Sequence, residues 1–191
     1  YRAGARRTLF LELQRQAAAS THLLEAEYAS IQGRAVDLSG SVNDALATTP
    51  ALKTVFPASG LAQQLRMAAR MIQARTAIGV SRQMFFIGMG GWDTHDTQLV
   101  DQERLLRVLS EGLLAFQTAI EEIGAQELVT LFTASDFGRT LTSNGDGSDH
   151  GWGGNALVMG GAVRGQRLYG RFPDLAIEGP DDAQQGRIIP T

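Results

Sequence analysis

The sequence Met84-Phe-Phe-Ile-Gly-Met89 is followed by the polar stretch Gly90-Gly-Trp-Asp-Thr-His-Asp96, and this junction decides the predicted fold. Residues 84–89 are nearly all apolar and have the length of a buried strand. Leucine, phenylalanine and isoleucine then recur on one side of a helical pattern from Leu99 to Ile123, which Gly124 ends. A second apolar run, residues 128–134, follows. This strand–helix–strand order predicts a parallel sheet covered by helices on both faces.

The first third of the chain has helical periodicity. Apolar residues between Phe10 and Ile31 lie three, four or seven positions apart, which predicts an amphipathic helix that ends near Gly33. Residues 37–56 are mixed in character and are predicted to form a loop with one short helix. A further helix is expected from Leu61 to Ile78, with Gly79 as its stop signal.

The predicted organisation is one domain, residues 1–191, which is the length of a single core. Residues 1–58 would form a helical insertion or cap, and residues 59–191 the core with its polar loops. Residues 156–163 would add a third strand.

Composition excludes several classes of protein. The net charge is −3, so no overall field draws the chain to nucleic acid or to an anionic membrane. There is no cysteine, which rules out disulfides and thiolate ligands. No apolar run reaches the roughly 20 residues that span a bilayer. Arg6-Arg7 is not followed by an apolar segment, so we assign this pair to the polar face of a helix.

Two polar clusters follow predicted strands, at the edge where open parallel sheets bind ligands. Asp93 and His95 are two residues apart, so in extended backbone they project to the same side, as two side chains that bind one metal ion must. Helix capping by Asp93, Asp96 or Thr97 explains the acidic residues equally well, and we expect Asp96 or Thr97 to be the cap.

Asp136 follows the second predicted strand, where a carboxylate needs a metal, an arginine or a helix terminus as its partner. Arg139 lies three residues on and would pair with it or bind an anionic substrate through its fork of donors. Ser135 has no recognisable base beside it. His150 lies in a glycine-rich stretch, which suits either a functional loop or a flexible turn.

The motifs taken together resemble a large bacterial family, domain of unknown function 1501. The resemblance covers roughly Leu61 to the end of the chain. It is carried by Arg82–Gln98, by Phe132-Thr-Ala-Ser-Asp-Phe-Gly-Arg-Thr140 and by Asn144-Gly-Asp-Gly-Ser-Asp-His-Gly-Trp-Gly-Gly154, with Gln64–Arg70 and Gly186–Thr191 in support.

That family is grouped with the alkaline-phosphatase-like superfamily of phosphatases and sulfatases. The resemblance implies a three-layer α/β/α sandwich with a mostly parallel sheet, incomplete in this chain. It also implies a divalent-metal site, with zinc, manganese, calcium or magnesium as the candidate ions. Carried over residue by residue, the metal ligands would be Asp93, His95, Asp136 and His150. Members are usually exported, which implies a periplasmic or secreted protein.

The sequence departs from the superfamily pattern in two ways. Phe137 stands where the superfamily has a histidine after the aspartate of the second strand, so one ligand of a second metal is missing. No segment supplies the nucleophilic Ser or Thr, and we expect further sequence before Tyr1 and after Thr191 in family members.

Two functions are therefore expected as alternatives. The first is a metal-dependent hydrolase of small phosphate or sulfate esters, with Arg139 and Ser135 as candidate catalytic residues. The second is a non-catalytic, exported binding or assembly protein on a degenerate phosphatase-like scaffold. No nucleic-acid partner is expected in either case.

Overall fold

The computed structural model describes residues 4–190, and the chain divides into two compact units. The first unit comprises Tyr1–Ala51 and Gln73–Gln83. The second comprises Leu52–Ile72 and Met84–Thr191, and it holds the four strands found among the described residues. The single domain expected over residues 1–191 stays a prediction. No described helix has both the length and the apolar character needed to cross a membrane.

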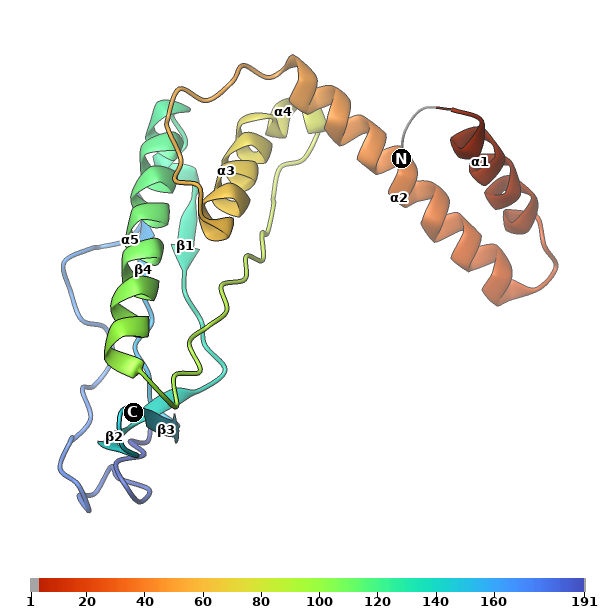
Figure 1. The fold of residues 1–191 in the computed structure, drawn as a ribbon. Coiled ribbons are helices and arrows are strands. Elements are labelled where there is room, and N and C mark those ends of the chain that lie inside the picture. The colour runs from red at the N-terminus through yellow and green to blue at the C-terminus, as the bar shows by residue number, and fades with distance from the viewer. Residues whose placement is uncertain (1–3, 191) are drawn as a thin grey trace. The chain divides into compact units, whose positions relative to one another are not determined.

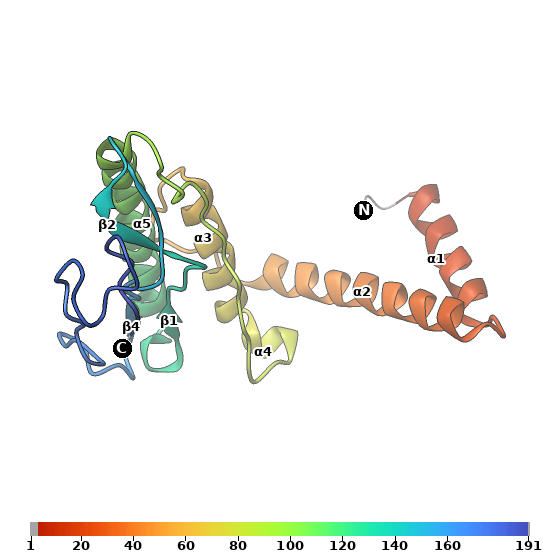
Figure 2. The same ribbon diagram turned by 90° about the horizontal axis from the view of Figure 1, so that it is seen from below.

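The first unit is helical. It contains α1 (Ala5–Ala18), α2 (Leu23–Thr48) and the short α4 (Arg75–Ile78), with α1 folded back against α2 (Figures 1 and 2). The single helix predicted from Phe10 to Ile31 is wrong, because the chain turns between α1 and α2. There the Ser20 hydroxyl accepts the His22 N–H at 3.1 Å and donates to Glu25 at 2.6 Å. Such local side-chain bonds compete with helical backbone pairing.

The predicted stop at Gly33 is also wrong. Helix α2 continues through Gly33 and Gly40 to Thr48, across much of the segment predicted to be loop. A glycine inside a helix costs about 1 kcal/mol relative to alanine, which a helix of 26 residues tolerates. By contrast, Gly124 follows the end of α5 (Gln98–Glu122) as predicted, with φ 64°. The single helix predicted from Leu61 to Ile78 is wrong, because the chain divides at Ala74 into α3 (Gly60–Gln73) and α4, and Gly79, with φ 79°, ends only α4.

The core of the second unit lies between two helices, α3 (Gly60–Gln73) and α5 (Gln98–Glu122), which run side by side (Figure 1). Its buried apolar residues are Leu61, Leu65, Ala68, Ala69, Ile72, Phe116, Ala119, Ile120 and Ala125. At the end of α5, Glu122 accepts the backbone N–H groups of Lys53 and Thr54 at 2.7 and 2.8 Å. These bonds hold down the segment before α3, from which Leu52 and Phe56 pack against the core.

The predicted three-layer sandwich with a mostly parallel sheet is wrong. The 3₁₀ turn η1 (Gln126–Leu128) leads into β1 (Thr130–Phe132), which pairs antiparallel with β4 (Val158–Gly160). Strand β2 (Gly138–Ser143) pairs antiparallel with β3 (Ser148–Gly151). The described residues contain these two small sheets, and both are two-stranded.

The stretch that led to the parallel-sheet prediction, residues 84–89, is extended but is not a strand. Phe85, Ile87 and Met89 pack against the helical core, whereas Met84 and Phe86 are each 98% exposed. The apolar run therefore covers the helices with one face only. Side-chain periodicity reports which residues are buried, and it carries no information on whether the backbone pairs with a neighbour.

Candidate metal centre

The β2–β3 hairpin brings two distant parts of the chain together. Arg139 on β2 lies directly opposite His150 on β3, so their side chains share one face of the hairpin. The hairpin contacts the segment before α5 through two backbone bonds: Gln98 N–H to the Asp146 carbonyl at 3.0 Å, and Ser148 N–H to the Thr94 carbonyl at 3.4 Å. These contacts place residues 93–95 beside β3.

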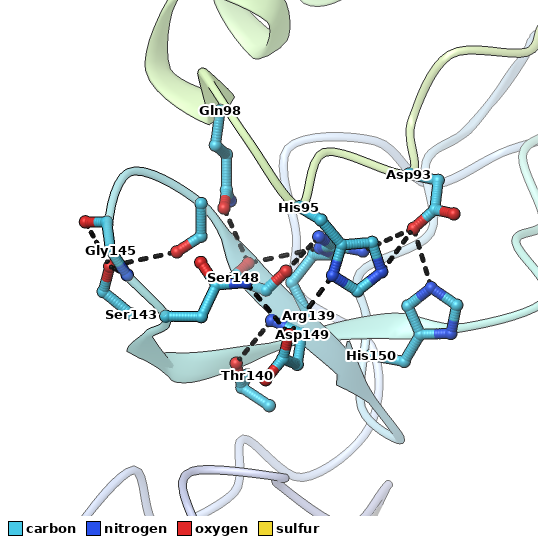
Figure 3. Close-up of polar contacts among 12 residues, drawn as sticks. Asp93, His95, Gln98, Arg139, Thr140, Ser143, Gly145, Ser148, Asp149 and His150 are labelled. Carbon is cyan, nitrogen blue, oxygen red and sulfur yellow. Dashed lines mark hydrogen bonds and ion pairs between the residues drawn. The ribbon is translucent and has the colours of Figure 1, made fainter.

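Three predicted metal-binding residues converge at this contact (Figure 3). The Oδ1 atom of Asp93 lies 2.7 Å from Nε2 of His150 and 3.0 Å from Nε2 of His95. One ligand atom from each of the three residues lies within 4.8 Å of the other two. The side chains are about half exposed, so the group is open to solvent on one side.

The charges around Asp93 keep it ionised. The hydrogen bond with His150, together with the bond from Arg139 and the nearby imidazoles, lowers the pKa of the Asp93 carboxyl below its ordinary value of 3.8. A carboxylate that is ionised at neutral pH is the form that binds a cation.

Arg139 is directed into the protein beneath this group, and its side chain is only 14% exposed. Its Nη1 donates to Asp93 Oδ1 at 3.0 Å and its Nε to the Ser148 hydroxyl at 3.2 Å. Its Nη2 donates to the Ser148 carbonyl, and the Ser148 hydroxyl in turn donates to Gln98 at 2.6 Å. The guanidinium thus supports Asp93. Its expected contact with a substrate stays a prediction.

Asp136 does not join the three converging residues, and Ser135 makes a local hydrogen bond. Asp136 is exposed and does not belong to the group of close ligand atoms found in the described part of the chain. The Ser135 hydroxyl donates to the Phe137 carbonyl at 2.9 Å. The Phe137 ring stacks on the imidazole of His150, with centroids 3.9 Å apart and planes 8° from parallel.

Capping of α5 does not explain the acidic residues in this segment. Thr97 holds the N-cap position with φ 47°, but its side chain makes no capping hydrogen bond. The Thr97 hydroxyl donates instead to Asp101 at 3.0 Å. The Asp96 and Asp146 side chains hydrogen-bond to each other, which raises the pKa of Asp96 above 3.8. Asp93 is therefore not the N-cap of α5, which was one of the alternatives that the sequence allowed.

Comparison with known protein families agrees with the motifs around this site. The family model described as "Protein of unknown function (DUF1501)" matches residues 2–185. The chain belongs to the DUF1501 family. No curated protein and no solved structure matches it. The match confirms the resemblance at the level of the family.

Sequence reasoning missed one residue of this DUF1501 site, Asp149. Its Oδ1 lies 3.2 Å from Nδ1 of His95 and accepts a 3.0 Å hydrogen bond from the Asn144 amide. These bonds, that from Asn144 foremost, lower the pKa of the Asp149 carboxyl below 3.8. Its position directly before His150 was the available signal. The contact with His95 joins residues 54 positions apart and was not readable from spacing.

The C-terminal segment supports the back of the hairpin. The Ile188 carbonyl accepts the Gly153 N–H at 2.6 Å, and Arg187 Nε donates to the His150 carbonyl at 3.2 Å. This segment is organised by Asp182, whose carboxylate accepts backbone N–H groups at 2.9 to 3.1 Å from Glu178, Gln184 and Gly186.

Proposed function

We propose that Asp93, His95 and His150 bind one divalent metal ion and that this centre serves the hydrolysis of a phosphate or sulfate ester. The observation that carries the metal site is the convergence of one carboxylate oxygen and two imidazole nitrogens within 4.8 Å of one another. Nothing else in the described residues brings three such groups together.

The donor set fits a transition-metal ion. Zinc bonds of about 2.0 to 2.2 Å in tetrahedral geometry place neighbouring ligand atoms roughly 3.3 Å apart. The two distances from Asp93 Oδ1, 2.7 and 3.0 Å, are shorter than that separation, so the side chains would move apart slightly to admit an ion. Imidazole donors favour zinc, copper, iron or nickel over calcium and magnesium, which prefer all-oxygen sites. Three protein ligands leave coordination positions open, as in catalytic zinc sites.

The chain's own residues would prepare the site for an anionic ester. A bound divalent ion would supply Lewis-acid polarisation of an ester oxygen. Arg139 holds Asp93 in place through its 3.0 Å bond, and the half-exposed side chains leave room for a small substrate. The choice of phosphate or sulfate esters, and of a periplasmic or secreted location, comes from the alkaline-phosphatase-like resemblance.

A second function is favoured by the hydrogen bonds that the candidate catalytic groups already make within the protein. Three N–H donors of Arg139 are engaged by Asp93 and Ser148, and the Ser135 hydroxyl donates to the Phe137 carbonyl. Asp136 lies outside the close group in the described residues. These observations support a metal-stabilised binding or assembly protein as the alternative.

The test is zinc and manganese binding to chelator-treated protein, measured by calorimetry, with turnover of aryl phosphates and sulfates measured in parallel. We expect one ion per chain, with binding weakened strongly in His150→Ala and unchanged in His22→Ala, a histidine in the first unit. Absence of binding to the wild-type chain would overturn the metal site. Stoichiometric binding without turnover would overturn the hydrolase and favour the binding protein.

A further inference from the structure

We propose that Asp149 is a positioning residue that fixes the orientation and tautomer of His95, so that His95 offers its Nε2 atom to the cation. This inference rests on the metal site proposed above. It assigns a role to a carboxylate that is not itself one of the three ligands.

The two nitrogens of His95 have different partners. Nδ1 faces Asp149 Oδ1 at 3.2 Å, and Nε2 faces Asp93 Oδ1 at 3.0 Å. A neutral imidazole has one N–H donor and one acceptor nitrogen, whereas a carboxylate only accepts. Once a cation lies between Nε2 and Asp93, the remaining acceptor for the ring proton is Asp149. The proton therefore belongs on Nδ1, and the lone pair of Nε2 faces the cation.

Asp149 is itself held in place by the hairpin. Its carboxylate accepts the 3.0 Å bond from Asn144, and its backbone N–H donates to the Thr140 hydroxyl at 3.1 Å. Thr140 is buried. The carboxylate is thus fixed before any cation arrives. A second residue that orients a metal-binding histidine in this way commonly raises affinity by restricting the ring.

The other histidine is held differently. The ring of His150 lies flat on Phe137, and its Nε2 lies 2.7 Å from Asp93. Asp149 contacts His95 and not His150 through its carboxylate. Loss of Asp149 is therefore expected to act through His95 alone, and this makes the inference testable by a double substitution.

The experiment is a zinc titration against a chromophoric chelator in the full chain. Asp149→Ala should weaken zinc binding about 10- to 100-fold. Asp149→Asn should restore most of the affinity, because the amide oxygen still accepts from Nδ1. In a His95→Ala background, Asp149→Ala should add no further loss. Glu103→Ala, which removes an exposed carboxylate paired with Arg107 on α5, is the control for lost negative charge.

A second measurement reads the histidine directly. Long-range ¹H–¹⁵N spectra of the zinc-bound wild type should show a protonated Nδ1 and a coordinated Nε2 at His95, and Asp149→Ala should lose this single pattern. Asn144→Ala, which releases the Asp149 carboxylate without changing it, should weaken zinc binding in the same direction but less. The Asn144→Ala variant therefore tests the role of Asp149 even if Asp149→Ala fails to fold.

The outcomes separate the two proposals. A wild-type chain that binds no zinc overturns the metal site itself. Zinc binding by the wild type with equal affinity in Asp149→Ala, or coordination through Nδ1, overturns only the role of Asp149. The role of Asp149 is also overturned if Asp149→Ala lowers zinc affinity by the same factor in the His95→Ala background as in the wild type. The effect would then not pass through His95.

Discussion

The core between α3 and α5 and the β2–β3 hairpin belong to the same unit but are stabilised by different means. In the core, Leu65 and Ile120 are 2% and 1% exposed and are surrounded by apolar side chains. In the hairpin, polar bonds join Arg139 to Ser148 and to Asp93 of the segment before α5, and glycines let backbones approach closely. The comparison teaches that the residues that stabilise the fold are separate from those of the proposed metal site.

The largest expected effect breaks the core and spares the site. Leu65→Ala should lower the free energy of unfolding by about 2 to 5 kcal/mol, because it removes buried methyl groups and leaves a cavity. Zinc affinity of the folded fraction should stay unchanged. Urea unfolding and zinc titration measure the two quantities. Leu114→Ala, at a side chain 70% exposed on α5, should change stability by no more than about 0.5 kcal/mol.

The next largest effect damages the proposed metal site and spares the core. A Cβ at Gly147 would overlap the backbone carbonyl of His95 and crowd the Asp96 nitrogen. Gly147→Ala should therefore push the hairpin away from residues 93–96 and cost about 1 to 3 kcal/mol, the usual range for overpacking. The loss of zinc affinity should be larger than the loss of stability in the core between α3 and α5. Gly90→Ala, where a Cβ would meet nothing within 4 Å, is the control. Equal zinc affinity in Gly147→Ala and Gly90→Ala would contradict the idea that contact between the hairpin and residues 93–96 supports the metal site.

The smallest effect concerns the edge of the core. The N–H groups of Lys53 and Thr54 and the Thr54 hydroxyl lower the pKa of Glu122 below its ordinary value of 4.5. A lowered pKa in the folded state means that the ionised group adds stability above pH 4.5, and that this is lost as the pH falls through the folded pKa.

Glu122→Gln should therefore be less stable than wild type at neutral pH, and the difference should shrink on acidification. Urea midpoints over a pH series measure it. Asp44→Asn, at a carboxylate in the first unit, is the reference. A difference that grows on acidification would contradict the assigned sign.

The sequence predicted the helices of the second unit better than its sheet. The apolar spacing on α3 and α5 reports a buried helix face directly, and Gly124 marks the end of α5. The run at residues 84–89 was misread because buried alternate residues occur both in paired strands and in extended segments that lie on helices. Pairing depends on partners elsewhere in the chain.

Only part of the candidate site was predicted, again because contacts between distant residues cannot be predicted from spacing. Asp93, His95 and His150 were identifiable from residue type, position after apolar segments and family resemblance, and the structure brings them together. Asp136 satisfied the same criteria but lies outside that group among the described residues. Asp149 was missed because its partner is distant in the chain. Spacing identifies which residue types are available, and only the register of β2 with β3 determines which of them meet.

The loop organised by Asp182 would make the proposed metal centre sensitive to events far from it. One carboxylate fixes the turn from which Arg187 and Ile188 reach the backbone of His150 and Gly153. A protease cut near residue 184, or a fusion that distorts this turn, would loosen a ligand strand without touching any ligand. Integrity of the C-terminal segment is thus a practical requirement for any preparation used to measure metal content.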